Sequence, residues 1–244
     1  MDCLDCTRWL PNIYVLCNPE YEPIRYQLLL KHLPARGIPL EKVKFVHGPW
    51  GSEINSETYF GVYDPFKSRF GSDTALCFKA ARLLKAEISL VLGFHKAIRI
   101  ALEDGVESAI FFESDVILRE DFLSRLKTVI GMSPVNVSKG CKEWDYISLG
   151  EGVGTRPPGH APSYFGPTQL YDAPHQFVFR CCDSMLLRRS FLEKLSQTLI
   201  PFRECLDWEL NIQMMVHRGK SLWVDPPLVE PGSGRSRTVS SLPS

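Results

Sequence analysis

Apolar positions change their spacing along the chain, and each change predicts a helix or a strand. Between Lys79 and Glu103, apolar residues recur every three or four positions, which is typical of an amphipathic helix. Gly105 follows, where glycine commonly ends a helix. The next stretch, Ala109 to Val116, starts with four apolar residues and has the aromatic content of a buried strand. A long helix followed by a buried strand is therefore expected near the middle of the chain.

The first fifty residues predict a strand, a helix and a second strand. Residues 12–17 and 43–46 are short apolar runs. Between them, Pro23 can open a helix that continues to about Ala35, and Gly37 can stop it. This order is typical of a βαβ unit, whose two strands are parallel.

The rest of the chain continues the alternation of helices and strands. We expect helices at 120–130, 190–198 and 206–217, strands at 144–149 and 221–224, and an extended segment at 176–187. Two long loops, 47–77 with one short helix and 150–175, are poor in periodicity. Ligands of open α/β sheets bind at the carboxyl ends of strands, so these loops are natural walls of a site.

Length and composition are typical of a globular protein with one large α/β domain or two small ones. The chain has 244 residues with 28 basic and 28 acidic side chains, and no strongly basic run that would indicate nucleic-acid binding. No apolar run approaches the length of a membrane span. We expect a flexible N-terminus at 1–11, a domain at 12–230 and a disordered tail at 231–244.

The lack of a recognisable signal peptide or membrane span in this sequence leads us to expect a cytoplasmic protein. Asp2 and Asp5 stand where a signal peptide carries basic residues, and no apolar segment follows them. The eight cysteines are therefore expected to be reduced thiols. Cys3 and Cys6 form a lone C-x-x-C pair, which without a second pair is weak support for zinc.

Two carboxylates end the central strand. Glu113 and Asp115 are spaced one residue apart, so an extended chain would point both to the same side. Such acids repel each other unless a cation or a positive ligand lies between them. Hard divalent cations bind these oxygens together with substrate phosphates. The strand end therefore predicts either a metal–diphosphate site or an ordinary polar end that faces water.

Several short segments occur in an order that resembles a known family. They are Tyr14-Val15-Leu16 with Arg25, Glu87-Ile88-Ser89, His95, Phe111-Phe112-Glu113-Ser114-Asp115, Cys182-Asp183-Ser184-Met185-Leu186-Leu187, Leu206-Asp207-Trp208-Glu209-Leu210 and Trp223-Val224-Asp225-Pro226-Pro227-Leu228-Val229. The set resembles glycosyltransferase family 25, the lipopolysaccharide-type galactosyltransferases with relatives in bacteria and large algal viruses. The resemblance spans about residues 12 to 235.

Two positions depart from the family pattern. Ser114 stands where the family has an acid, and Phe94 stands where it has a serine beside its histidine. Ser114 weakens metal binding if that position is a direct ligand, and matters little if Glu113 and Asp115 bind the metal.

The resemblance implies a GT-A-type single domain, with a mostly parallel Rossmann-like central sheet and flanking helices. The donor half would be about 12–118 and the acceptor half about 119–230. The implied activity is metal-dependent transfer of a sugar from a UDP-sugar to a glycan hydroxyl, with inversion. Galactose is the first expectation for the donor, followed by glucose or xylose. A retaining transferase and a non-catalytic nucleotide-sugar or glycan-binding module stay open; for a viral relative the location would be the host cytoplasm.

The donor site can be assigned residue by residue from this resemblance. Asp115 would bind Mn²⁺ or Mg²⁺ directly, and Glu113 would assist on the metal or on the ribose hydroxyls. Arg25 could bind the phosphates through its guanidinium fork, or could be an ordinary surface arginine. His95 would contribute to donor binding or to the surrounding hydrogen bonds, although a lone helical histidine is often only structural.

The acceptor site is assigned in the same way. Asp207 would be the general base, with Glu209 as the fallback, although an Asp at a helix start is often only a cap. The loop residues Glu151, Tyr164, Tyr171 and His175 are candidate contacts to the acceptor sugar, and simple loop packing is the alternative for each of them.

Overall fold

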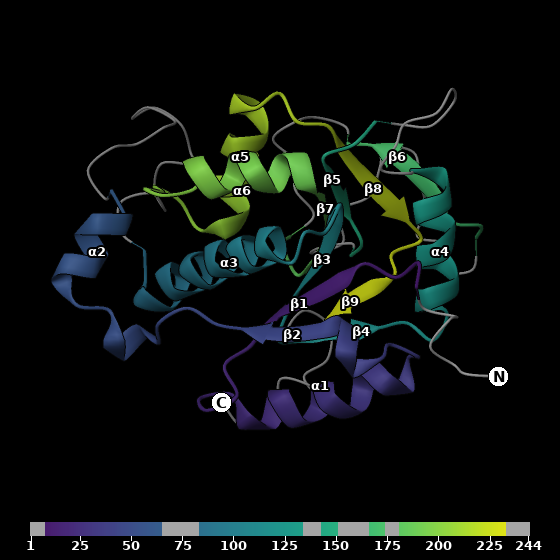
Figure 1. Cartoon of the computed structure of the whole chain (residues 1–244), viewed down its shortest axis with the longest axis horizontal. Helices are drawn as coiled ribbons and strands as arrows, with labels where there is room; N and C mark the ends of the chain where they lie inside the picture. The colour runs from purple at the N-terminus through teal and green to yellow at the C-terminus, as the bar shows by residue number, and fades with distance from the viewer. Residues whose placement is uncertain (1–7, 65–82, 134–142, 151–165, 174–180, 233–244) are drawn as a thin grey trace.

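A seven-stranded sheet with helices on both faces forms the centre of the protein (Figure 1). The computed structural model describes residues 8–64, 83–133, 143–150, 166–173 and 181–232. The strands lie in the order β2 (Val43–Val46), β1 (Asn12–Leu16), β3 (Ser108–Glu113), β7 (Ser184–Arg188), β5 (Tyr146–Ser148), β8 (Ser221–Asp225) and β6 (Gln169–Asp172). In this sheet β7 and β6 run against the other five strands. The expected α/β fold with a mostly parallel sheet is confirmed.

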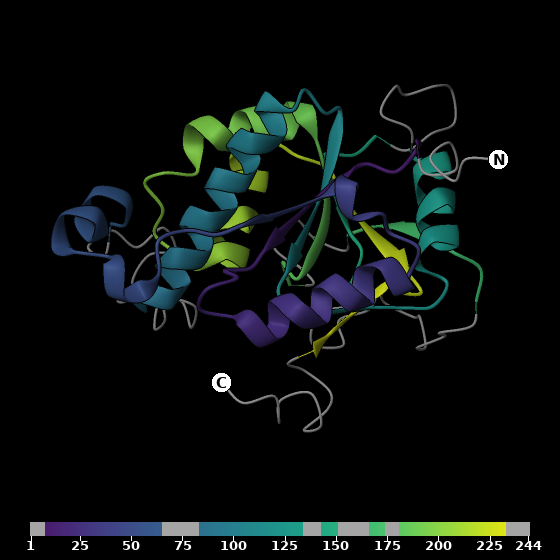
Figure 2. The same ribbon diagram turned by 60° about the horizontal axis from the view of Figure 1, so that its bottom comes forward.

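Helices cover the two faces of the sheet unequally. They are α1 (Pro23–Ala35), α2 (Ser56–Val62), α3 (Lys85–Glu103), α4 (Phe122–Met132), α5 (Arg189–Thr198) and α6 (Leu206–Val216). In Figures 1 and 2, α3, α5 and α6 lie together on one side and α1 lies on the other. Two short 3₁₀ helices, η2 (Leu40–Lys42) and η3 (Gly51–Glu53), flank β2. Within the described ranges, no helix combines the length and the apolar character that crossing a membrane requires.

Alternation along the strands builds two hydrophobic cores. Tyr14 and Phe111 pack into the core under α3, α5 and α6, whereas Val15 and Phe112 pack into the core under α1 and α4. All four side chains are fully buried, because each face of the sheet is covered by helices. Burial of apolar surface on both faces is the main force that holds the sheet rigid.

The N-terminal half follows the sequence pattern closely. Helix α1 runs from Pro23 to Ala35 as predicted, and Gly37 and Gly105 both adopt positive φ where helices end. Helix α3 begins at Lys85, not at Lys79, and Glu87 accepts a hydrogen bond from the Leu84 amide at its start. Residues 79–82 of the predicted helix lie outside the described residues.

Short strands account for most of the differences from prediction. The segment 150–175, predicted as a loop, contains β6, and 116–118 forms β4, which pairs with β9 (Val229–Pro231) in a separate two-stranded sheet. Pro231, the first residue of the predicted tail, is the last residue of β9, and residues 233–244 lie outside the described part. These strands have three or four residues and pair with distant partners, so local periodicity does not reveal them.

Candidate active site at the carboxyl edge of the sheet

The carboxyl ends of three parallel strands open into a pocket of about 280 Å³. Its wall consists of residues that follow β1, β2 and β3, together with one side of α3: Leu16, Cys17, Asn18, Glu22, Arg25, Val46, His47, Gly48, Trp50, Ala86, Ser89, Leu90, Gly93, Glu113, Ser114 and Asp115. This is the edge at which open α/β sheets bind ligands. The start of the loop after β2 forms part of the wall, as expected.

The acidic strand end bends at Ser114. Ser114 and Asp115 form a turn that leads β3 into β4, so the strand alternation stops at Glu113. Strand alternation therefore does not extend to Asp115, yet Glu113 and Asp115 both line the pocket. The Asp115 carbonyl accepts a hydrogen bond of 2.7 Å from the Gly232 amide, and a Cβ at Gly232 would lie 2.3 Å from that oxygen. The close approach of a glycine fixes this turn against the end of β9.

Ser114 belongs to a hydrogen-bonded network with Glu22 and Arg25. Its hydroxyl donates to Glu22 Oε1 at 2.8 Å and accepts from Arg25 Nη1 at 3.0 Å. Arg25 Nη1 also lies 3.1 Å from Glu22 Oε1, and Glu22 Oε2 accepts from the Asn18 amide. This network holds the Arg25 guanidinium beside the acidic strand end. Ser114 therefore organises a positive charge here, in a position where the resembling family carries an acid.

Glu113 lies among other carboxylates. Burial, followed by the charges of Asp115, Asp183 and Asp207, raises the pKa of Glu113 to about 8, and the nearby Arg25 acts in the opposite direction. These four acids come from three separate parts of the chain. The fold therefore gathers like charge at this edge of the sheet, which is common at functional sites.

Asp183 is the carboxylate that the sequence analysis did not single out. It precedes β7 directly opposite Glu113, whose amide donates to the Asp183 carbonyl at 2.9 Å. Asp183 is only 4% exposed, and its burial is the main reason that its pKa is raised to about 7. An acid that directly precedes an apolar strand was a usable signal. The antiparallel pairing that puts it beside Glu113 was not readable from the sequence.

The donor set at this edge fits a hard divalent cation. Carboxylate oxygens are the ligands that Mn²⁺ and Mg²⁺ favour. Asp183 Oδ2 is buried and has no hydrogen-bond partner, which is costly for a carboxylate unless a proton or a cation compensates it. Over the described ranges, no group of three or more His, Cys, Asp or Glu side chains is arranged as a ready metal site. The side chains would therefore have to converge for a cation to bind.

Asp207 and Glu209 have different surroundings although both lie in the first turn of α6. Cys205 is the N-cap residue of α6. Asp207 is therefore not a helix cap, which was the structural alternative to its role as general base. The charge of Asp207 raises the pKa of both Glu113 and the Cys181 thiol. Asp207 therefore lies near the cluster of Glu113, Asp115 and Asp183, which we call the acidic edge of the sheet. Glu209 is 0% exposed and accepts hydrogen bonds from the Arg203 amide and from a neighbouring glutamine. Its buried, structural position argues against the fallback role.

Of the remaining predicted residues, the two that the structure describes, His95 and Tyr171, do not line the pocket. His95 contacts the Ser196 carbonyl of α5 at 3.2 Å and is not among the wall residues. Tyr171 lies on β6, the third strand beyond β7, where its hydroxyl donates to Gln169. Three further acceptor candidates lie outside the described residues, namely Glu151, Tyr164 and His175.

Two features of the pocket wall were missed by the sequence analysis. His47 follows β2 and lies 3.3 Å from the Asn18 amide nitrogen through its Nδ1 atom. Trp50, a wall residue, stacks on Tyr21 with ring centroids 4.7 Å apart and planes only 7° from parallel. The position of His47 directly after a parallel strand was a usable signal, because such positions meet at one edge. The pairing of Tyr21 with Trp50 depends on two loops and had no local signature.

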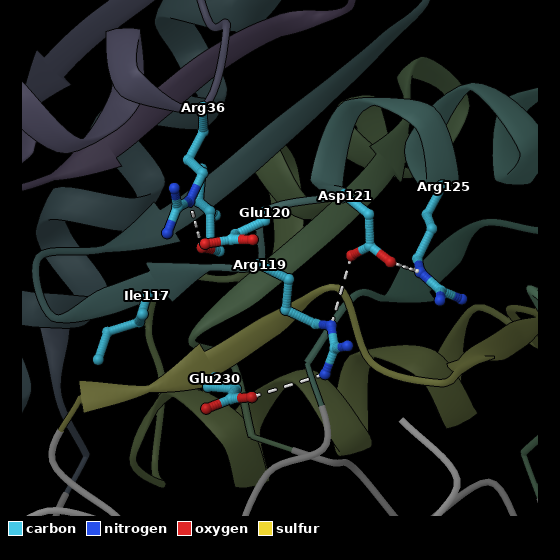
Figure 3. Close-up of a pocket in the computed structure, with 8 residues that line it drawn as sticks. Arg36, Ile117, Arg119, Glu120, Asp121, Arg125 and Glu230 are labelled. Carbon is cyan, nitrogen blue, oxygen red and sulfur yellow. Dashed lines mark hydrogen bonds and ion pairs between the residues drawn. The ribbon is translucent and has the colours of Figure 1, made fainter. Parts of the chain in front are cut away.

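A second, larger pocket of about 490 Å³ lies by the two-stranded sheet of β4 and β9 (Figure 3). Arginines and acids line it, and most of them are paired. Asp121 contacts both Arg119 and Arg125, and Arg119 also reaches Glu230 at 3.7 Å. Arg36 donates from Nε to the Leu118 carbonyl at 2.9 Å. The charges of this pocket therefore largely compensate each other.

Comparison with known proteins adds a distant structural likeness. No family model matches the chain, and no curated protein matches it. Among solved structures, the chain is similar to residues 1–349 of TarS from S. aureus, with 13% sequence identity and a TM-score of 0.44. The match covers 90% of this chain and 59% of that one, so the chain spans less than two thirds of its length. At this distance, the case for a function depends on the residues of the site.

Proposed function

We propose that this protein is a metal-dependent glycosyltransferase that transfers a sugar from a UDP-sugar to a glycan hydroxyl. The observation that carries the proposal is the pocket at the ends of β1, β2 and β3, with Arg25 beside Glu113 and Asp115. A guanidinium next to acids at this edge suits a diphosphate together with a divalent cation. UDP-galactose is the first donor to test, followed by UDP-glucose and UDP-xylose.

Each part of the donor would meet a different part of the wall. Asp115 and Glu113 would hold Mn²⁺ or Mg²⁺, and Arg25 would bind the diphosphate through its free guanidinium nitrogens. When bound, the cation would offset the charge of the leaving diphosphate. The pocket between α3 and the ends of β1 and β2 would take the nucleoside, with His47 and Trp50 in its wall.

Asp207 would act as the general base of an inverting reaction. The acceptor oxygen would attack the anomeric carbon while the bond from that carbon to the diphosphate breaks. The hydroxyl proton would pass to Asp207, and UDP would leave with the bonding electron pair. The support for this role is the location of Asp207 within electrostatic reach of Glu113, on the face of the sheet that α6 covers.

Calorimetry of UDP binding tests the metal-dependent site. We expect Mn²⁺ to strengthen UDP binding at least about tenfold in the wild type, and Asp115→Asn to abolish that gain. Asp121→Asn, a matched change in the second pocket, should preserve it. An Asp115→Asn protein that still shows the full Mn²⁺ effect would refute the assignment.

Product analysis decides between the alternatives. NMR of the product anomer separates an inverting from a retaining transferase. Metal-dependent UDP binding without hydrolysis or transfer across the three donors would instead indicate a non-catalytic binding module.

A further inference from the structure

Asp183 occupies a place in the sheet that faces the acidic edge. It lies opposite Glu113 in the antiparallel pairing of β3 with β7, because Phe112 pairs with Ser184 one step before. Opposite residues of an antiparallel pair point to the same face. The next residues of that face, Phe111 and Met185, belong to the core under α3, α5 and α6. The carboxylates of Glu113 and Asp183 therefore emerge on the side where α6 presents Asp207.

One oxygen of Asp183 has no partner. The Ser184 hydroxyl lies 3.3 Å from Oδ1, whereas Oδ2 is buried and makes no hydrogen bond. The residue is 96% buried, since its exposed fraction is 4%. Buried carboxylate oxygens are normally hydrogen-bonded or bound to metal, so this oxygen is placed to take up a proton or a cation.

Gly150 brings the backbone close to the same carboxylate. A Cβ built at position 150 would lie 2.9 Å from both carboxylate oxygens of Asp183 and 2.8 Å from Ser184 Oγ. A side chain at position 150 would therefore push the Asp183 carboxylate out of its place. The absence of a side chain here leaves the carboxylate oriented by packing, which is a requirement for a well-defined ligand.

We propose that Asp183 is an additional oxygen ligand of the divalent cation, joining the start of β7 to the acidic end of β3. This inference rests on the proposed function, because it extends the cation site assigned there to Asp115 and Glu113. The cation would complete the coordination of Oδ2 and reduce the repulsion among the carboxylates of Glu113, Asp115 and Asp183. Asp207 would then remain free of the metal for its role toward the acceptor.

Mn²⁺ binding to the full chain tests this ligand without any measurement of activity. Electron paramagnetic resonance of free Mn²⁺ gives the affinity, and water-proton relaxation gives the number of water molecules on the bound ion. Asp183→Asn should weaken Mn²⁺ binding at least about tenfold and add about one bound water. Asp172→Asn, an exposed acid on β6, is the matched control and should change neither quantity.

Gly150→Ala provides a second variant that keeps every charge. Its methyl group would displace the Asp183 carboxylate, so it should also weaken Mn²⁺ binding and add a bound water. This variant matters if Asp183→Asn fails to fold.

The outcomes separate this inference from the proposed function. Wild-type Mn²⁺ affinity in both variants would overturn it, and so would a weaker affinity with an unchanged water count, because Asp183 would then act only through its charge. If Asp115→Asn abolishes Mn²⁺ binding while Asp183→Asn does not, only the additional ligand is refuted. If the wild type binds no Mn²⁺, both proposals fail.

Discussion

The two pockets described above differ in how their charges are arranged: one pairs opposite charges, and the other brings like charges together. In the larger one, Arg119 and Arg125 contact Asp121, and Arg119 also contacts Glu230. In the smaller one, Glu113 lies near three other carboxylates, and the Arg25 charge only partly offsets them. The first arrangement needs no ligand for its charges to be compensated. In the second arrangement, repulsion among the carboxylates lowers stability, and a bound cation would reduce that repulsion.

This difference teaches that pocket size is a poor guide to chemistry here. The paired pocket has the larger volume, about 490 Å³ against about 280 Å³. Glu113, whose pKa is raised, lines the smaller pocket, and Asp183, with a raised pKa and an unpaired buried oxygen, lies next to it across the strand pair. Substitutions in the two pockets should therefore affect different properties, and the following experiments compare them.

The largest effect is expected from Asp207→Asn at the acidic edge. If Asp207 is the general base, sugar transfer should slow about 10²–10⁴-fold, while Mn²⁺-dependent UDP binding stays within about twofold. Steady-state rates and calorimetry measure the two quantities. Glu209→Gln on the same helix is the control, and it should lower the thermal midpoint more than the rate. Equal loss of rate in both variants would contradict the role of Asp207.

The pH dependence of stability should come from the acidic edge. Glu113 has an ordinary pKa of 4.5 and a folded pKa of about 8, so the folded state keeps a proton that the unfolded state releases between these values. Asp183 behaves in the same way up to about pH 7. Without metal, the free energy of unfolding should therefore be highest near pH 4.5 and fall by several kcal/mol up to pH 8.

Denaturation in EDTA across this pH range measures that fall. The charged groups that act on Glu113 are Asp115, Asp183, Asp207 and Arg25. A double variant, Glu113→Gln with Asp183→Asn, should lose most of the slope. A slope that survives in the double variant would assign the pH dependence to other groups.

In the paired pocket, Arg125→Ala should affect stability and not ligand binding. Arg125 pairs with Asp121 and donates to the Gly166 carbonyl and the Thr168 hydroxyl. Loss of these contacts should lower the free energy of unfolding by about 2 kcal/mol. UDP and Mn²⁺ affinities, measured by calorimetry, should match the wild type. A clear loss of UDP binding would show that the two pockets are not independent.

The smallest effect is expected from Ser114→Ala. The change removes the hydroxyl that links Glu22 and Arg25, which is worth about 1 kcal/mol. If Arg25 binds the diphosphate, UDP affinity should fall a few-fold while Mn²⁺ affinity is unchanged. Ser124→Ala, at an exposed serine of α4, is the matched control. A fall in Mn²⁺ affinity would indicate that Ser114 also touches the cation.

Sequence periodicity predicted the long elements and missed the short ones for a physical reason. Helix α3 buries a long apolar stripe, so its pattern is visible locally, and the bounds of α1 are marked by Pro23 and Gly37. Strands β4, β6 and β9 are held by pairing with distant segments, which leaves no local pattern. In the candidate site too, the residues with a local sequence signal were predicted and those placed by strand pairing were not. Glu113 and Asp115 follow a recognisable buried strand.

The parts of the site that depend on pairing between strands could not be predicted. The place of Asp183 depends on the register of β3 with β7, and the turn at Ser114 depends on the hydrogen bond from Gly232 to Asp115. Ser114 itself was noticed as a departure from an acidic pattern. Its contacts with Glu22 and Arg25 explain that departure, and they involve a loop and a helix start far from it in the sequence.

The register of β3 with β7 also has a consequence for how the chain folds. Glu113 and Asp183 are 70 positions apart in the sequence, yet one backbone hydrogen bond joins them. Closing so long a segment costs chain entropy, and here it also brings two acids together. A cation bound across this junction would act as a removable cross-link, and refolding in its presence should be faster than refolding with a chelator.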